Sequence, residues 1–143
     1  MPPADRVRRF PAERLKQLLA ARSFDAAAWN DALASQAHIR IANGPPIAGK
    51  QDVMAALAAF TEAVHLCSGE FLEMWQQRET IFIETEFSGR RHSHGDQRFP
   101  CVIIVRTTFG LIQDMRFHLD PAITVNAREG RNPGAVWQAG TRA

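Results

Sequence analysis

The stretch that decides the fold is FPCVIIVRTTFGLIQDMRFHLD, residues 99–120. It predicts two long antiparallel strands joined by a tight turn at Phe109 and Gly110. In the second strand Met115 and Phe117 share one face, and charged side chains alternate with them. This period of two is typical of a strand with one buried face.

The first strand of this hairpin is apolar on both faces. Cys101, Ile103 and Val105 fall on one face, and Val102, Ile104 and Arg106 fall on the other. A strand of this kind is usually covered on both sides. We therefore expect one face of the sheet to line a pocket and the other face to meet a second copy of the chain.

A second hairpin is predicted just before the first. Residues 71–75 lead to a polar turn at Gln77 and Arg78, and residues 81–87 form the return strand. With a two-residue turn, Met74 opposes Ile81 and Leu72 opposes Ile83 on one face. Residues 88–98 are expected to form the loop between the two hairpins.

The residue pattern of the N-terminal half predicts three helices and one strand. Pro11 is placed to begin the first helix, Ser23 to cap a helix over residues 24–34, and Gly49 to precede a helix over residues 50–66. Between the last two helices, residues 36–41 alternate as a strand that ends at Asn43-Gly44-Pro45-Pro46. We interpret Trp29, in the second helix, as a core residue.

Composition excludes several classes of protein. The 143 residues suffice for one domain with its own core, and the net charge of +2 comes from basic termini around a mildly acidic middle. This distribution does not fit a nucleic-acid-binding face. No apolar run is long enough to span a membrane. Cys67 and Cys101 form no CxxC pattern, so we expect a cytoplasmic protein with two buried thiols.

Histidines offer no convincing metal site. His92 and His94 lie two residues apart, with only Asp96 nearby, whereas a zinc site needs three or four ligands. We interpret this stretch as a solvated basic loop. His38 and His65 have no partner nearby in the sequence, so we expect neither a metal nor another cofactor.

Three helices followed by strands indicate an α+β fold. The run IRIANGPPIAGKQDVMAALAAF, the strand with Trp75, the Gly95-Asp96 loop and the ending FGLIQDMRFHLDP resemble the SnoaL-like branch of the nuclear transport factor 2-like superfamily. The resemblance covers roughly residues 12–123. It implies a cone-shaped, curved mixed β-sheet wrapped around about three N-terminal helices and enclosing a pocket, commonly in a dimer. Residues 1–11 would then be an N-terminal arm, 12–125 the SnoaL-like domain and 126–143 a C-terminal tail.

Enzymes of the superfamily place their catalytic groups at positions that differ here. The general base of ketosteroid isomerase relatives aligns with Arg40. The Arg and two Asp of limonene epoxide hydrolase relatives align approximately with Thr85, Phe87 and Phe117. The acid and histidine of the polyketide cyclases have His118 and Asp120 as nearest equivalents, but strand alternation places these two outside the cavity.

The predicted inward side chains are almost all apolar. They are Ile39, Ile41, Leu57, Phe60, Leu72, Ile83, Phe87, Cys101, Ile103, Met115 and Phe117, with Thr85 as the one polar member. Such a lining favours a small hydrophobic ligand, although the same side chains could simply fill the cone. The sequence therefore predicts a ligand-binding protein with no recognisable catalytic set. The alternative is a SnoaL-like cyclase, isomerase or hydratase acting on a hydrophobic ring compound.

The outward side chains predict a homodimer. Phe82, Glu84, Val102, Ile104, Arg106 and Arg116 combine an apolar patch with charges of both signs, which is typical of an interface. The competing explanation is that the C-terminal tail folds back and covers this patch with Trp137.

Overall fold

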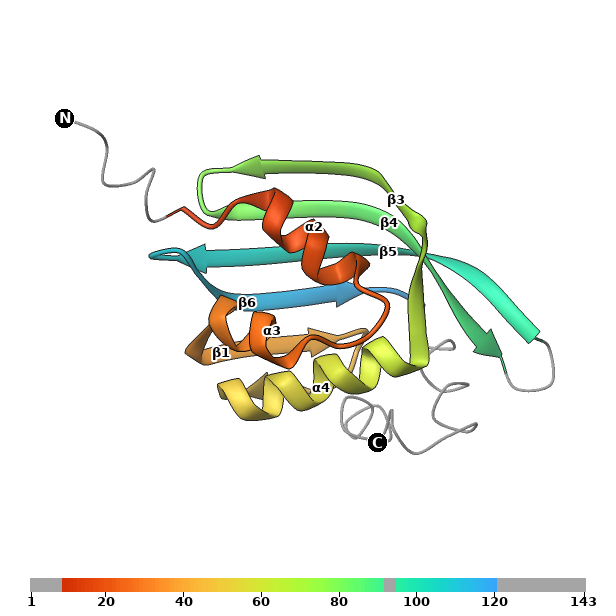
Figure 1. Ribbon diagram of the computed structural model, residues 1–143, viewed down its shortest axis with the longest axis horizontal. Helices are drawn as coiled ribbons and strands as arrows, with labels where there is room; N and C mark the ends of the chain where they lie inside the picture. Colours follow the sequence, from red (N-terminus) through yellow and green to blue (C-terminus); the bar gives the residue numbers. More distant parts are fainter. Residues whose placement is uncertain (1–8, 92–94, 121–143) are drawn as a thin grey trace.

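A curved six-stranded sheet carries helices on one of its faces in the computed structural model, which describes residues 9–91 and 95–120 (Figure 1). The helices are α2 (Ala12–Ala20), α3 (Ala26–Ala32) and α4 (Lys50–Ala63). The strands are β1 (Leu33–Ile41), β2 (Ile47–Ala48), β3 (Val64–Gln77), β4 (Thr80–Arg91), β5 (Gly95–Thr108) and β6 (Leu111–His118). The predicted α+β class is confirmed.

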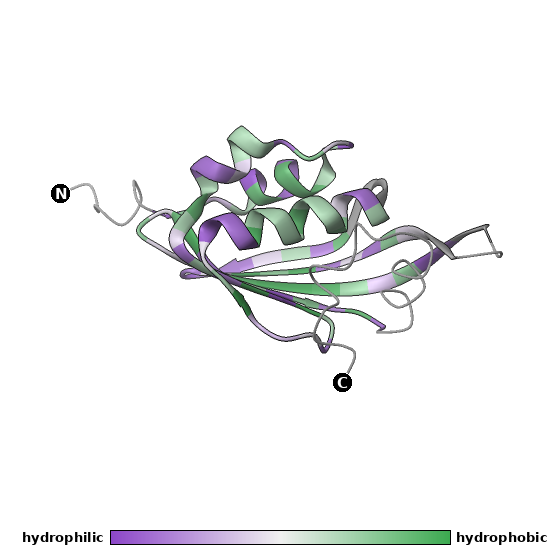
Figure 2. Ribbon diagram, turned by 90° about the horizontal axis from the view of Figure 1, so that it is seen from below, coloured by the Kyte–Doolittle hydropathy of each residue, from purple (hydrophilic) through white to green (hydrophobic). Residues whose placement is uncertain are grey.

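The sheet has the strand order β2-β1-β6-β5-β4-β3. Its pairs are antiparallel except for β1 and β6, which run parallel. Figure 2 shows the two layers, with all three helices on one side of the sheet. The other face of the sheet, which we call the outer face, carries none of these helices.

The central hairpin of β5 and β6 forms as predicted. Its turn is Phe109-Gly110, where both residues have positive φ, 54° and 78°. Val105 pairs with Met115, and both are fully buried. A register shift follows Arg106. Beyond it the buried position of β6 falls on Ile112.

The second hairpin differs from the prediction in its register. The turn lies at Arg78 and Glu79, so Met74 pairs with Ile83 rather than with Ile81. Further along, β3 has register shifts on both sides of Phe71. These irregularities leave Leu72 60% exposed, so its predicted inward orientation was wrong.

The predicted loop at residues 88–98 is largely strand. β4 continues to Arg91 and β5 begins at Gly95, with Ser88 paired to Arg98. The polar composition suggested a loop, but long antiparallel strands tolerate polar residues where both faces reach solvent. His92 and His94 lie outside the described residues.

Three helix boundaries also need correction. α3 ends at Ala32, and Leu33 and Ala34, which were predicted to be helical, begin β1. Asp25 is the N-cap of α3, and its Oδ1 accepts a hydrogen bond from the Ala28 N–H at 3.0 Å, so Ser23 is not the cap. α4 ends at Ala63, and Val64 already begins β3. Gly49 precedes α4 as predicted, with a φ of 96° that glycine adopts readily.

The core lies between the helices and the concave face of the sheet. Leu15 of α2, Trp29 of α3 and Leu57 of α4 meet the inward side chains of β1, β4, β5 and β6 there. Among the described residues, only Thr85 and Thr107 are polar and buried. This apolar interior determines what kind of site the fold can hold.

Candidate functional site

The predicted inward residues are buried, with Leu72 as the exception. The buried members are Ile39, Ile41, Leu57, Phe60, Ile83, Thr85, Phe87, Cys101, Ile103, Met115 and Phe117. Most of them belong to one cluster of buried, packed side chains. The interior is therefore largely filled by its own side chains, as is usual for apolar cores.

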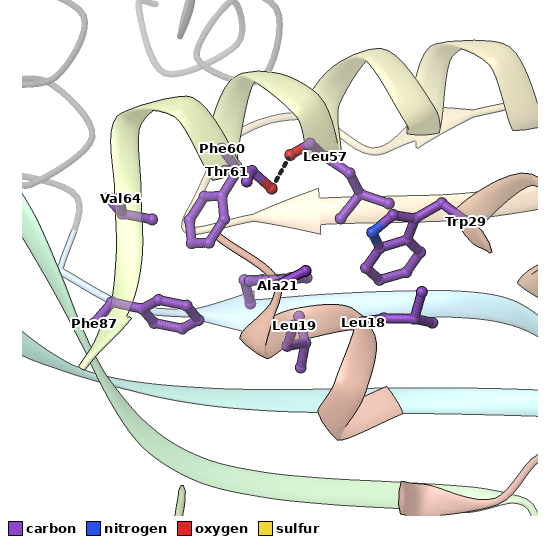
Figure 3. A pocket seen from close by; sticks show the side chains of 10 residues that line it. Leu18, Leu19, Ala21, Trp29, Leu57, Phe60, Thr61, Val64 and Phe87 are labelled. Carbon is purple, nitrogen blue, oxygen red and sulfur yellow. Dashed lines mark hydrogen bonds between the residues drawn. The ribbon is translucent and has the colours of Figure 1, made fainter. Parts of the chain in front are cut away.

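A small cavity remains between the end of α2, the α2–α3 link and α4 (Figure 3). Its volume is about 20 Å³. Its lining residues are Leu18, Leu19, Ala21, Trp29, Leu57, Phe60, Thr61, Val64, Phe87 and Phe117. Leu57, Phe60, Phe87 and Phe117 are the members of the predicted inward set that line it.

The remaining lining residues were not predicted, because they come mainly from the helices. Leu18 and Leu19 lie in the last turn of α2, and Ala21 follows in the link to α3. Trp29 was expected only to fill the core. The helical spacing of the leucines indicated a buried face, but the sequence could not show that this face covers an opening.

One wall of the cavity is a cluster of three phenylalanines. The ring of Phe60 meets that of Phe87 at 5.3 Å and that of Phe117 at 5.0 Å, both edge to face. Aromatic pairs favour this geometry, so the cluster forms a well-defined wall. The opposite wall, with Leu18 and Leu19, consists of flexible aliphatic side chains.

The hydroxyl of Thr61 is already engaged. It donates to the carbonyl of Leu57, one turn earlier in α4, at 2.8 Å (Figure 3). The other lining side chains are apolar except for the indole of Trp29. No carboxyl, imidazole, amine or thiol lines the cavity in the part of the chain that the structure describes.

The nearest buried thiol is unsuited to nucleophilic chemistry. Cys101 is 1% exposed, and burial raises the pKa of its thiol to about 12. Because the thiolate is the reactive form, this cysteine is a core residue rather than a nucleophile. The side chain of Cys67 lies outside the described residues.

The residues that align with catalytic groups of the resembling enzymes do not converge on the cavity. Arg40 is exposed, and its Nε donates to the carbonyl of Gly44 at 2.9 Å. His118 and Asp120 are also exposed. Phe87 and Phe117 line the cavity but carry no acid or base. Thr85 is fully buried and is not among the lining residues.

The predicted interface residues lie on the outer face. Val102 is 38% exposed, and Phe82 stacks on Trp75 with ring centroids 5.6 Å apart. Ile104 is half-buried, and Glu84 is exposed. Trp75, at 48% exposure, extends this apolar patch onto β3.

Charges on the outer face are unevenly distributed. Arg106 and Arg116 both pair with Asp114, with N–O distances of 3.5 Å and 3.1 Å. Glu73 pairs directly with Glu84 across β3 and β4, which places two like charges side by side. The β3–β4 side of this face is therefore acidic, and the β5–β6 side is basic.

No group of three metal-ligating side chains occurs within residues 9–91 and 95–120. His38 is exposed on β1, and the side chain of His65 is not among those described. None of the helices described is long and apolar enough to cross a membrane.

Comparison with known families gives one match. The model of the SnoaL-like domain matches residues 12–115, which is most of the chain. A search of curated proteins found no significant match.

Solved structures with the same fold are numerous but distant in sequence. A protein from Jannaschia sp. CCS1, provisionally described as a SnoaL-like polyketide cyclase, is 13% identical, with a TM-score of 0.68 over 81% of this chain and 89% of that one. A nuclear transport factor 2-like protein from Anabaena variabilis ATCC 29413 is 13% identical, with a TM-score of 0.60 over 76% and 83%.

A third similar structure contains a ligand. It is a protein with a ketosteroid isomerase-like fold from Catenulispora acidiphila DSM 44928, in complex with trimethylamine, 15% identical with a TM-score of 0.65 over 87% of this chain and 96% of that one. At these identities the likeness establishes the fold.

Proposed function

This chain belongs to the SnoaL-like domain family, and we propose that it binds a small, largely apolar molecule in the cavity beneath α2 without catalysing a reaction. The observation that carries the proposal is the lining of the cavity. Every described side chain that lines it is apolar except for the Thr61 hydroxyl, which already donates to the protein, and the Trp29 indole. Apolar lining with few polar groups is typical of sites for hydrophobic small molecules.

A ligand can enter only if the cavity enlarges. About 20 Å³ is room for roughly one water molecule, whereas an apolar cavity that binds benzene has about 150 Å³. The aromatic wall is anchored in α4 and the sheet, so the opposite wall is the one that can move. We propose that the last turn of α2, with Leu18 and Leu19, lifts when the ligand binds.

The attachment of α2 supports this movement. At its N-terminal end, Gln76 of β3 accepts from the Ala12 N–H at 3.3 Å and donates to the Phe10 carbonyl at 2.8 Å. At its other end, the chain leaves the helix through Ala21 in an extended conformation, with no basic side chain in the last turn. α2 is thus tethered to the sheet at the end far from the cavity.

Binding of α-methylstyrene, an uncharged apolar probe, tests this function. At ten times its Kd it should stabilise the protein by about 1.4 kcal/mol, which raises Tm by about 4 °C. Thr61→Phe should abolish the shift because the larger side chain fills the cavity. Thr61→Val, which keeps the volume and removes only the hydroxyl, should retain it. An unchanged Tm in the wild type, or an equal shift in Thr61→Phe, would contradict the proposal.

The enzymatic alternative has less support. It rests on the provisional description of the Jannaschia protein, which is 13% identical. General acid–base catalysis needs titratable groups within hydrogen-bond reach of the substrate. Its nearest candidates, His118 and Asp120, are exposed.

We also propose a homodimer built on the outer face. In this dimer the outer faces of two copies pack together around a two-fold axis that runs parallel to the strands. The acidic β3–β4 side of one copy would then lie against the basic β5–β6 side of the other. Val102, Ile104 and the Trp75–Phe82 pair would form its apolar centre. Within the chain, Arg106 and Arg116 share one carboxylate, that of Asp114. The pair therefore carries an excess positive charge, which a carboxylate of the other copy, such as that of Glu84, would neutralise.

A reducing compartment such as the cytoplasm fits this protein best. Cys101 is a free, buried thiol with no role in a disulfide. Disulfides form mainly in oxidising compartments, and their absence at a buried cysteine is usual elsewhere.

A further inference from the structure

Trp29 has an indole N–H with no acceptor among residues 9–91 and 95–120. Its side chain comes from α3 and is buried, with 3% of its surface exposed. Its backbone N–H donates to Asp25, but among the residues that the structure describes none accepts a hydrogen bond from the indole Nε1–H. Buried donors are nearly always paired, so an unpaired one points to a partner from outside the chain.

The indole N–H is directed into the cavity. Figure 3 shows the nitrogen on the edge of the ring that faces Leu57 and Phe60. The only other polar side chain of the lining, Thr61, donates its hydrogen to Leu57. The indole is therefore the one side-chain donor that this lining offers to a bound molecule.

The surroundings restrict what the donor can bind. An indole N–H donates and cannot accept, so its partner must be an acceptor. A charged acceptor such as a carboxylate would lose its hydration among Phe60, Phe87 and Phe117 with no cation in the lining to compensate. A neutral acceptor, such as a carbonyl oxygen, has no such cost.

We infer that the ligand of this cavity is a small neutral molecule with an apolar body and one carbonyl-type oxygen, which accepts a hydrogen bond from Trp29 Nε1. This inference rests on the proposed function, because it names the ligand class of the same cavity. It assigns Trp29 as the residue that orients the ligand, with the apolar body lying against the three phenylalanine rings.

Two probes of the same shape separate this inference from simple hydrophobic binding. Acetophenone and α-methylstyrene differ only in C=O against C=CH₂, so both fill the cavity alike and only the ketone can accept a hydrogen bond. Acetophenone should bind about three- to tenfold more tightly, the range expected for one neutral hydrogen bond. In Trp29→Phe this preference should disappear, whatever the variant does to the affinity of both probes.

Nitrogen-15 NMR of the wild type gives a second readout that needs no folded variant. The chain has 3 tryptophans, and the indole signal absent from Trp29→Phe identifies that of Trp29. Acetophenone should move this indole proton downfield, and α-methylstyrene should not. If that variant does not fold, the indole signal that shifts in parallel with the Leu57 and Phe60 amides serves for the assignment.

The outcomes are distinct. Equal affinity for the two probes would overturn the inference and leave the proposed function standing. The same holds if acetophenone binds without changing the chemical shift of the Trp29 indole proton. Failure of both probes to bind would overturn the proposed function and this inference with it.

Discussion

Phe117 is the residue at which the aromatic wall meets the sheet. It is 1% exposed, and its ring packs edge to face against Phe60. We expect Phe117→Asp to lower the free energy of unfolding by more than about 3 kcal/mol, because it removes a buried ring and buries an unpaired carboxylate. A thermal melt measures the effect.

The matched control is His118→Asp, one residue further along β6. His118 is exposed, so the same new carboxylate reaches solvent there and the melt should stay within a degree or two of wild type. Similar melts for the two variants would contradict the inward orientation of Phe117.

Because the thiol of Cys101 is buried, we expect the free energy of unfolding to depend on pH. Burial raises the pKa of its thiol from 9.0 to about 12. In the unfolded chain the thiol ionises near pH 9.0, so the folded state loses relative stability as the pH rises from about 9 to about 12. At pH 10.5 this loss is about 2 kcal/mol.

Comparison with Cys101→Val isolates this contribution, since other groups titrate alike in both proteins. The Tm of wild type relative to the variant should fall between pH 8 and pH 10.5. A difference in Tm that is the same at the two pH values would show that the folded-state thiol ionises as freely as the unfolded one.

At the scale of the elements, α3 depends on its N-cap. Asp25→Ala removes the hydrogen bond to the Ala28 N–H and should cost about 1 kcal/mol. Ser23→Ala is the matched control, because Ser23 has the residue type of a cap but lies outside the helix. Chemical denaturation of both variants provides the test, and an equal loss would mean that α3 begins earlier than described.

Strands with strict alternation could be predicted from the sequence. Residues 36–41 of β1 and the turn of the β5–β6 hairpin appear where the period of two placed them, because one buried face restricts the register. β1 begins earlier than predicted, at Leu33, and the β5–β6 pair has a register shift after Arg106. The positive φ values at Phe109 and Gly110 fit the predicted tight turn.

The register of the β3–β4 hairpin was not predictable in the same way. Moving the turn by one residue changes every pairing along it, and the composition of Gln77, Arg78 and Glu79 does not favour one turn position over another. Leu72 was misplaced for this reason, and the shifts beside Phe71 have no sequence signal that we could identify.

The candidate site was predicted in its chemistry but not in its position. The apolar character of the interior follows from the sequence, and Phe60, Phe87 and Phe117 were in the predicted set. The volume left between them depends on where the end of α2 lies relative to α4, which residue patterns do not encode. That the indole N–H of Trp29 has no acceptor among the described residues could be recognised only from the packing around it.

At the scale of the whole molecule, the dimer can be tested by Ile104→Glu. A glutamate in the apolar centre of the outer face should convert a dimer into a monomer, because burying it without a partner is unfavourable. Size-exclusion chromatography with light scattering at micromolar concentration measures the mass. Ala27→Glu, which adds the same charge on the exposed surface of α3, should remain dimeric.

A wild-type mass of one chain would rule the dimer out. In that case a loss of stability in Ile104→Glu would favour the alternative in which the C-terminal tail covers the patch. That tail, with Trp137, lies outside the described residues.

The parallel pairing of β1 with β6 joins the earliest strand of the sheet to the latest. During translation, β1 leaves the ribosome long before β6 exists, so its inner edge has no partner while α4, β3, β4 and β5 are being made. Ile39 and Ile41 therefore lack their pairing partners, Met115 and Phe117, throughout that interval. Nascent chains stalled before residue 111 should therefore be bound by chaperones, and those extended past residue 120 and clear of the exit tunnel should be released.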